Sequence, residues 1–404
     1  MIGSLDDWRW AVSDQAAELR ALITPDAPVG TLARLRDRWP AERVAVVTEL
    51  LAGRSAASTK FGERAGRMAC DREGAEMASS ALAAAYKAAR IRATLGDGAQ
   101  VLDACCGIGG DTMGLVWAGL SVTAIDADER RSWMAGYNAG CEAVCADIRA
   151  FEGGITGLHI DPSRRSAGRR TRDADAFEPP LDDVRALIDR ARVTAVKLNP
   201  GTDAAGLPDG ELEIISEAGR LTQGVHWTGL TDLQTRRATM IDRDGTVRTL
   251  AGNPDRPYDA TEIGPWIHTF DPAVERADLV HLLIAETGLE LVHPGTGLLT
   301  GGSAGTSGWL RPYRVVEDAP WNLKKVRARL RELNAGIVTV KTRAAVVDPD
   351  RLSRDLRGKG GRDLVLFVLK IGEKPRAIIT EPADGNAPPA GACTADGAAG
   401  GGPP

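Results

Sequence analysis

The chain has 404 residues, enough for two or three domains that each bury a hydrophobic core. Its formal net charge of −5 excludes a general electrostatic attraction to nucleic acid, so any such contact must come from a local basic patch. The six cysteines lack the paired spacing of a disulfide framework or a zinc motif, and no apolar run is long enough to span a bilayer. The N-terminal residues do not have the pattern of a signal peptide. We therefore expect a cytoplasmic protein with no metal site and no membrane contact.

Residues 1–95 carry apolar side chains at helical spacing and are expected to form a helical domain. Pro40 is expected just inside a helix start. The polar and basic stretch 54–61 predicts a solvated connection, with contact to a substrate phosphate as the alternative. An alanine-rich helix over 75–90 is expected to deliver the chain into the first strand.

A glycine-rich turn follows that first strand. The strand, 101–104, runs into the stretch 103–111 (DACCGIGGD), and a helix is predicted through Trp117. Glycines let the backbone turn tightly and approach a ligand where a Cβ would clash. The dinucleotide fingerprint fits poorly, because Thr112 occupies its last glycine position and Asp103 has no role in it. The pattern acid-x-x-x-Gly-x-Gly-Gly instead resembles the first motif of class I S-adenosylmethionine-dependent methyltransferases.

Acids end four successive predicted strands. Asp103 is placed to accept a hydrogen bond from a ligand ammonium, and Asp126, about 20 residues after the glycine turn, is placed to hold two ribose hydroxyls. Asp147 follows the third strand, where methyltransferases usually carry an acid for the adenine amino group, and Asp161 follows the fourth. Any one of them alone is better explained as a helix cap or turn residue, but in an open α/β sheet all four converge on one crevice. The predicted residues of the S-adenosylmethionine site are Asp103, Cys105, Gly107, Gly109, Gly110, Asp111, Asp126, Asp147 and Asp161.

The remaining pattern predicts the rest of an α/β core over 96–242. Strand 193–198 and the alternating stretches 211–215, 224–228 and 237–241 are expected to complete a seven-stranded, Rossmann-like sheet with an antiparallel end. Residues 243–313 are expected to form a connecting segment with a helix around 273–287 and a flexible loop at 296–308.

The stretch 314–383 predicts a small α+β domain with a local positive excess, and the tail 384–404 is expected to be disordered. A basic patch on an otherwise acidic protein suits a phosphate-backbone contact, although a solvated helix face explains the same charges equally well. The basic side chains predicted to contact RNA are Arg165, Lys324, Lys325, Arg327, Arg331, Lys341 and Arg343.

Several motifs together resemble bacterial class I methyltransferases with a C-terminal THUMP-like domain, a family of RNA methyltransferase candidates. The similarity rests on the stretches 103–111, 161–165 (DPSRR), 196–201 (VKLNPG), 270–277 (FDPAVERA) and 338–343 (VTVKTR), and on the turn 359–361. The resemblance implies an α/β methyltransferase core, S-adenosylmethionine as cofactor and RNA, either tRNA or rRNA, as partner.

Asp161, Pro162 and Arg164 are the predicted catalytic residues. Amino-directed methyltransferases often carry Asp/Asn-Pro-Pro-aromatic at this place, and Asp161-Pro162 keeps only its first half. Asp161 is expected to orient the acceptor or take its proton, while Arg164 and Arg165 clamp a phosphate beside the methyl donor. Two rival functions stay open: a small-molecule methyltransferase, and a non-catalytic RNA-binding protein that keeps the cofactor fold. The RNA, the base and the oligomeric state do not follow from the sequence.

Overall fold

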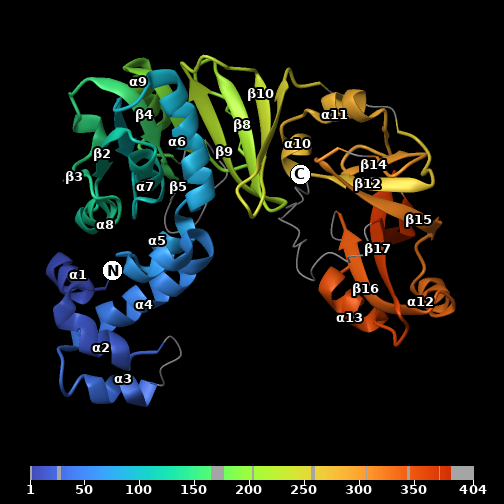
Figure 1. Ribbon diagram of the computed structural model, residues 1–404, viewed down its shortest axis with the longest axis horizontal. Coiled ribbons are helices and arrows are strands. Elements are labelled where there is room, and N and C mark those ends of the chain that lie inside the picture. Colours follow the sequence, from blue (N-terminus) through green and yellow to red (C-terminus); the bar gives the residue numbers. More distant parts are fainter. Residues whose placement is uncertain are drawn as a thin grey trace, which may run out of the picture. The chain divides into compact units, whose positions relative to one another are not determined.

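The computed structural model describes residues 2–24, 29–164, 177–202, 204–255, 260–305, 307–343, 346–372 and 374–383. It divides into two compact units, of which the first contains Met1–Ile215 and Gln223–Thr235 and the second Ser216–Thr222 and Arg236–Pro404. The first unit combines the N-terminal helices with a largely parallel sheet, and the second is built mainly on an antiparallel sheet (Figure 1). The predicted tail, 384–404, lies outside the described residues.

The N-terminal part of the first unit is helical, as predicted. Its helices are α1 (Leu5–Val12), η1 (Asp14–Ala16), α2 (Ala17–Leu22), α3 (Val29–Leu35), α4 (Ala41–Phe61), η2 (Gly62–Arg67), α5 (Arg72–Met77) and α6 (Ala81–Leu95). Helix α1 begins at a capping box in which Ser4 and Asp7 satisfy each other's backbone amides. Pro40 lies one residue before the first residue of α4, not inside that helix.

The stretch 54–61 forms the last turns of α4, so the prediction of a solvated connection is wrong. Ala57 and Phe61 in this stretch are buried. The Lys60 ammonium donates to three backbone carbonyls between residues 75 and 78 at 2.6–3.1 Å. Small Ala and Ser side chains let these turns pack closely, and the lysine charge is used to satisfy carbonyl groups of a neighbouring segment.

These helices share one hydrophobic core with the α/β part of the unit. Trp8, Leu50 and Phe61 are buried in the same cluster as Ile108 of the glycine-rich turn and Met134 of α8 (Glu129–Ala139). Burial of apolar surface is the main stabilising term in folding, so the helices and the turn should stabilise each other.

Over the described residues, the largely parallel sheet has nine strands, two more than the predicted seven, and its order is β3-β2-β1-β4-β7-β9-β8-β10-β11. Its first seven strands in chain order are β1 (Gln100–Ala104), β2 (Ser121–Asp126), β3 (Glu142–Cys145), β4 (Ile155–Ile160), β7 (Ala191–Leu198), β8 (Glu211–Glu217) and β9 (Arg220–Thr228), and β10 (Arg236–Ile241) covers the predicted strand at 237–241. The first five run parallel, and β9 pairs antiparallel with β7. The helices α6, α7 (Gly110–Trp117) and α8 pack side by side, and α9 (Leu181–Asp189) packs on β7. A short pair, β5 (Ser163–Arg164) and β6 (Phe177–Glu178), stands apart from this sheet.

The second unit contains a hairpin and a seven-stranded sheet. The hairpin is β10 (Arg236–Ile241) with β11 (Val247–Gly252). The sheet order is β13-β14-β12-β15-β18-β17-β16. Its strands are β12 (Trp266–Phe270), β13 (Glu290–Leu291), β14 (Leu298–Gly301), β15 (Leu310–Pro320), β16 (Ala335–Thr342), β17 (Arg362–Ile371) and β18 (Lys374–Pro382), and the unit's helices are α10 (Pro272–Arg276), α11 (Val280–Thr287), α12 (Leu323–Glu332) and α13 (Pro349–Leu356).

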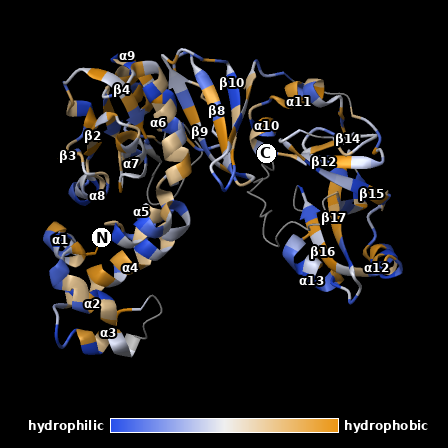
Figure 2. Cartoon of the chain, viewed as in Figure 1, coloured by the Kyte–Doolittle hydropathy of each residue, from blue (hydrophilic) through white to orange (hydrophobic). Residues whose placement is uncertain are grey.

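The segment predicted as a connection, 243–313, contributes strands to this sheet. Strand β12 pairs antiparallel with β15 and with β14, and Leu298 and Leu299 of β14 are buried. The prediction of a flexible loop over 296–308 is therefore wrong where β14 lies, because two leucines among glycines were enough for a short strand. Figure 2 shows apolar residues along β17, whose two faces both pack into buried clusters. Among the described residues, no helix combines the length and apolarity needed to cross a bilayer.

Candidate active site

The turn after β1 has the backbone shape that its glycines predict. Gly107 and Gly109 have φ angles of 57° and 83°, in the left-handed region, and α7 begins directly after Gly109. A Cβ on Gly109 would lie 2.8 Å from the Cα of Ala135, so packing against α8 requires glycine there. A Cβ on Gly107 would meet no described atom within 4 Å. Gly107 is thus the glycine that leaves open space beside the backbone, as a ligand-binding turn needs.

Asp126, at the end of β2, is tied to this turn. Its Oδ2 accepts from the backbone amide of Gly107 at 2.9 Å, and its Oδ1 accepts from the amide of Asp128 at 2.9 Å. Burial raises the pKa of the Asp126 carboxyl, although these two backbone hydrogen bonds oppose the shift. The sequence-predicted pair of glycine turn and second acid is therefore brought together by the structure.

Asp103 is turned away from solvent, with a side chain that is 1% exposed. Its Oδ1 lies 2.7 Å from Nδ1 of His159 on β4, and its Oδ2 accepts from the hydroxyl of Thr112 on α7. Both carboxylate oxygens thus have protein partners. This geometry favours a role in holding the turn to β4 over the predicted direct contact with a ligand ammonium.

A buried lysine that the sequence did not single out contacts His159, the partner of Asp103. Lys87 of α6 is 1% exposed, and its ammonium lies 2.6 Å from Oδ1 of Asp111 at the start of α7. It also contacts Ser79, His159 and Gln223 at 3.3, 3.3 and 2.9 Å. Because lysine offers only donors, the contact favours a His159 whose Nε2 accepts and whose Nδ1 donates to the Asp103 carboxylate.

The charges of this pair depend on each other. Burial alone would raise the pKa of Asp111, but Lys87, followed by His159 and Lys197, more than offsets that effect and holds the pKa far below its usual range. Asp111, predicted to bind cofactor, is 8% exposed and is occupied by Lys87 and by the hydroxyl of Ser79 at 2.7 Å. Its observed role is to anchor the start of α7.

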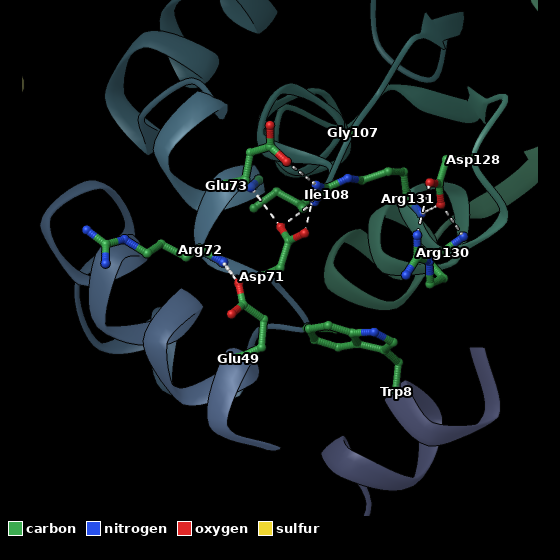
Figure 3. A network of polar contacts seen from close by, with 12 residues as sticks. Trp8, Glu49, Asp71, Arg72, Glu73, Gly107, Ile108, Asp128, Arg130 and Arg131 are labelled. Atoms are coloured by element: carbon green, nitrogen blue, oxygen red, sulfur yellow. Dashed lines mark hydrogen bonds and ion pairs between the residues drawn. The ribbon is translucent and has the colours of Figure 1, made fainter. Parts of the chain in front are cut away.

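The start of α5 packs against the glycine-rich turn and against α8 (Figure 3). The Arg131 guanidinium on α8 makes two hydrogen bonds to Asp71, the N-cap of α5, at 2.6 and 2.8 Å. The Asn138 amide on α8 donates to the carbonyl of Ile108 at 2.8 Å and pairs with the backbone of residue 69. A Cβ on Gly74 would lie 2.4 Å from Ile108. The N-terminal helices therefore help to set the position of the turn.

Asp161 follows β4 and pairs with Lys197 of β7 at 2.6 Å. Pro162 is buried. Arg164 belongs to β5, but its side chain and the whole of Arg165 lie outside the described residues. The proposed phosphate clamp of Arg164 and Arg165 therefore stays a prediction.

Asp147 stands apart from this buried group. It is half-exposed, caps the short helix η3 (Ile148–Ala150), and forms an ion pair with Arg149. That pair, through a side-chain hydrogen bond first and a backbone hydrogen bond second, lowers the pKa of the Asp147 carboxyl. Its predicted contact with an adenine amino group stays a prediction.

The two cysteines of the turn are poor nucleophiles. Cys105 adopts a left-handed φ of 55°. Burial, followed by the nearby carboxylates, raises the pKa of its thiol well above the usual range, and the same causes raise that of Cys106. Both thiols are therefore protonated at neutral pH.

The predicted RNA-contacting side chains fall into two groups. Four are exposed on α12 and make no ion pair with another described residue: Lys324, Lys325, Arg327 and Arg331. By contrast, the Arg343 guanidinium pairs with Glu275 at 3.2 Å, and the Lys341 ammonium lies 5.2 Å from the ring centre of Tyr313. The α12 group is the better candidate surface, because its charges are not already compensated.

Comparison with known proteins identifies the family of the chain. A THUMP domain-like family model matches residues 310–382. An uncharacterised S-adenosylmethionine-dependent methyltransferase of Mycobacterium tuberculosis, found in two strains, is 31% identical over 372 residues, covering 86% of this chain and 97% of the relative. The chain belongs to the S-adenosylmethionine-dependent methyltransferases. The methyltransferase also shares its fold with a candidate methyltransferase of Porphyromonas gingivalis, whose crystal structure superposes with a TM-score of 0.67 at 18% identity and covers 95% of this chain and 100% of that one.

The resemblance inferred from the motifs is thus confirmed: the methyltransferase has a class I core and a C-terminal THUMP-like domain, and S-adenosylmethionine is its cofactor. The open space beside Gly107, next to the Asp126 carboxylate, fits a ribose-bearing ligand at the carboxyl edge of the sheet.

Sequence reasoning missed Lys87, His159 and Lys197. Each is a polar residue inside an otherwise apolar or alanine-rich stretch, and that contrast was the available signal. A buried titratable group needs a partner, so a lysine within a buried strand or helix predicts an acid nearby.

Proposed function

We propose that the methyltransferase modifies RNA, and that the exposed basic face of α12 in the THUMP-like domain contacts the phosphate backbone. The observation that supports an RNA substrate is this group of four uncompensated cations on a chain of net charge −5. When bound, S-adenosylmethionine supplies a methyl group that passes to a nucleophile while the electron pair of the carbon–sulfur bond returns to sulfur.

The side chains near the glycine-rich turn favour a methyl acceptor atom with its own lone pair, such as a base nitrogen, over a carbon atom. A carbon acceptor in a pyrimidine would call for a thiolate nucleophile, and burial keeps both Cys105 and Cys106 protonated. Asp161 is 37% exposed in its side chain and can accept a hydrogen bond from an N–H group. We propose that it orients a nitrogen of a tRNA or rRNA base and stabilises the positive charge that develops there. Five described cysteines without disulfides suit a cytoplasmic location.

The test is transfer of radiolabelled methyl from S-adenosylmethionine into total RNA from a strain that lacks the gene. Label in the RNA is expected, and digestion to nucleosides would then identify the base. A variant Asp126→Ala serves as the blank. If the protein binds the cofactor but labels no RNA, the function is either small-molecule methylation or cofactor-dependent RNA binding, and assays with metabolite extracts separate the two.

Neutralising Lys324, Lys325, Arg327 and Arg331 to alanine is expected to weaken affinity for bulk tRNA by at least about tenfold at roughly 0.1 M salt. The slope of log affinity against log salt should become shallower by up to about 3, because fewer counterions are released. Gel-shift titrations at several salt concentrations would measure both.

A single-residue comparison provides the control on the same helix. Arg327 has no described ion-pair partner, whereas Arg329 contacts Glu317 at 2.7 Å and Glu332 at 2.9 Å. Arg327→Ala should therefore reduce tRNA affinity more than Arg329→Ala. Equal losses, or none in the fourfold variant, would show that α12 is not the RNA surface.

Cofactor affinity is expected to fall in mild acid because of Asp126. Its pKa is raised by burial, so as the pH falls it becomes protonated earlier than an ordinary aspartate, and a neutral carboxyl accepts ribose hydroxyls less well. Asp126→Asn should weaken binding at neutral pH and remove this part of the pH dependence. Calorimetric titration with S-adenosylhomocysteine between about pH 4.5 and 8 would check it; an unchanged pH profile in the variant would exclude Asp126 as the titrating group.

A further inference from the structure

Strands β4 and β7 place a lysine beside the proposed acceptor-binding carboxylate. They are adjacent and parallel, with Ile160 opposite Val196 in the register. The next residues therefore lie side by side: Asp161 directly follows β4, and Lys197 is the next residue of β7. Their Nζ–Oδ2 distance is 2.6 Å, and the Lys197 side chain is only 14% exposed.

Only one oxygen of the Asp161 carboxylate is used in this pair. Lys197 donates to Oδ2, and no described residue donates a hydrogen bond to Oδ1. Since the side chain is 37% exposed, Oδ1 remains available to a ligand. The lysine thus fixes which oxygen faces outward.

The lysine keeps its charge in spite of its burial. Burial alone would lower the pKa of Lys197, but the carboxylates of Asp161, Asp111 and Asp103 more than offset this and raise it. Asp103 and Asp111, which lie next to the glycine-rich turn, therefore stabilise the same Lys197 ammonium that contacts Asp161. The charges near the proposed cofactor site and the carboxylate proposed to bind the acceptor thus form one electrostatic group.

We propose that Lys197 is a positioning residue for methyl transfer, and that its ammonium holds Asp161 so that Oδ1 faces the methyl acceptor. The proposal rests on the function proposed above for Asp161. Lys197 acts through the carboxylate and need not touch the acceptor itself. Without the ammonium, the carboxylate can rotate and attract any nearby cation with both oxygens.

This role can be tested by ligand binding, without knowing the RNA. The probe is a cofactor analogue that carries an amine in place of the transferable methyl, compared with S-adenosylhomocysteine, which carries neither group. Calorimetry gives the ratio of the two dissociation constants. Lys197→Met should shift this ratio in favour of the amine analogue on the order of tenfold, because the competing ammonium is gone. Asp161→Asn should shift it in the opposite direction.

Lys87→Met is the matched control, since it removes a second buried lysine under the same sheet. Lys87 pairs with Asp111 and not with Asp161, so the ratio should stay within about twofold of the wild-type value while affinity for both ligands falls. A purely structural effect of Lys197 would give this same pattern. Should Lys197→Met fail to fold, Lys197→Gln replaces it, and Lys197→Arg should retain the wild-type ratio because it retains the charge.

The outcomes separate this proposal from the one on which it rests. An altered ratio in Asp161→Asn with an unaltered ratio in Lys197→Met would overturn the role of Lys197 alone. Unaltered ratios in both would remove Asp161 from the methyl site and overturn both proposals. If RNA accepts label, Lys197→Met should also lower kcat at least about tenfold with little change in KM for S-adenosylmethionine, the split expected of a positioning residue.

Discussion

Replacing Asp161 with asparagine is expected to lower the rate of methyl transfer about 100- to 1,000-fold while cofactor affinity stays within a few-fold of the wild-type value. Asparagine can still accept one hydrogen bond, but it loses the negative charge that stabilises a nitrogen becoming positive as it takes up the methyl group. It also loses the ion pair with Lys197, whose ammonium is left close to the acceptor. Single-turnover transfer of label into total RNA from the deletion strain would measure the rate.

The matched control for this variant is Asp147→Asn. Asp147 also follows a parallel strand and also pairs with a basic side chain, but it is half-exposed and its partner, Arg149, belongs to the same short turn. Its loss should affect cofactor affinity, if it contacts the adenine, and leave the rate at saturating cofactor nearly unchanged. A wild-type rate in Asp161→Asn would remove Asp161 from the chemistry.

The fold could be predicted in outline because its signals are local. Predicted strands such as 120–125 and 157–160 are followed at once by an acid, Asp126 and Asp161, and the strand order of a class I sheet brings those strand ends to one edge. The pairing of Asp126 with the glycine turn at Gly107 was predictable for that reason. Asp126 was identified by its distance along the sequence from the glycine-rich turn.

The support behind the turn could not be predicted, because it comes from contacts distant in sequence. Asp71 and Arg131 are separated by 60 residues, and Lys87 and Gln223 by 136. No periodicity links such pairs. The same limit applies to Asp103 and Asp111: their predicted contact with the ligand stays a prediction, and their buried partners His159 and Lys87 could not be read from the sequence.

The second unit shows a different limit. A small α+β domain was predicted over 314–383, where β16, β17 and β18 lie, whereas the short strands β12 and β14 were read as part of a connection. Strand β14 pairs with β12, and β12 pairs with β15, which in turn pairs with β18 far along the chain, for example Val315 with Thr380. Short strands gain stability from their neighbours, and local sequence contains little of that information.

Replacing Lys87 with methionine is expected to destabilise the first unit by about 3–5 kcal/mol, the cost of leaving a buried charge without its partner. Methionine fills a similar volume but cannot compensate Asp111, which is 8% exposed and lies 2.6 Å from the lost ammonium. Urea unfolding followed by circular dichroism would measure the change. Arg92→Met on the same helix is the control: Arg92 pairs with Asp97 at the surface, and its removal should have little effect.

The pH dependence of the Lys87 effect identifies its cause. In the wild type the pKa of Asp111 is lowered, so the carboxylate contributes stability above roughly pH 4, the usual aspartate range, and that contribution is lost as the pH falls through the folded-state pKa. In Lys87→Met the carboxylate has lost its cation, so the stability difference between the two proteins should be largest near neutral pH and shrink in acid, where Asp111 takes up a proton. The double variant Lys87→Met, Asp111→Asn should recover much of the loss, because no unpaired charge remains. A deficit that is independent of pH and persists in the double variant would instead point to lost packing of the lysine side chain between α6 and the sheet.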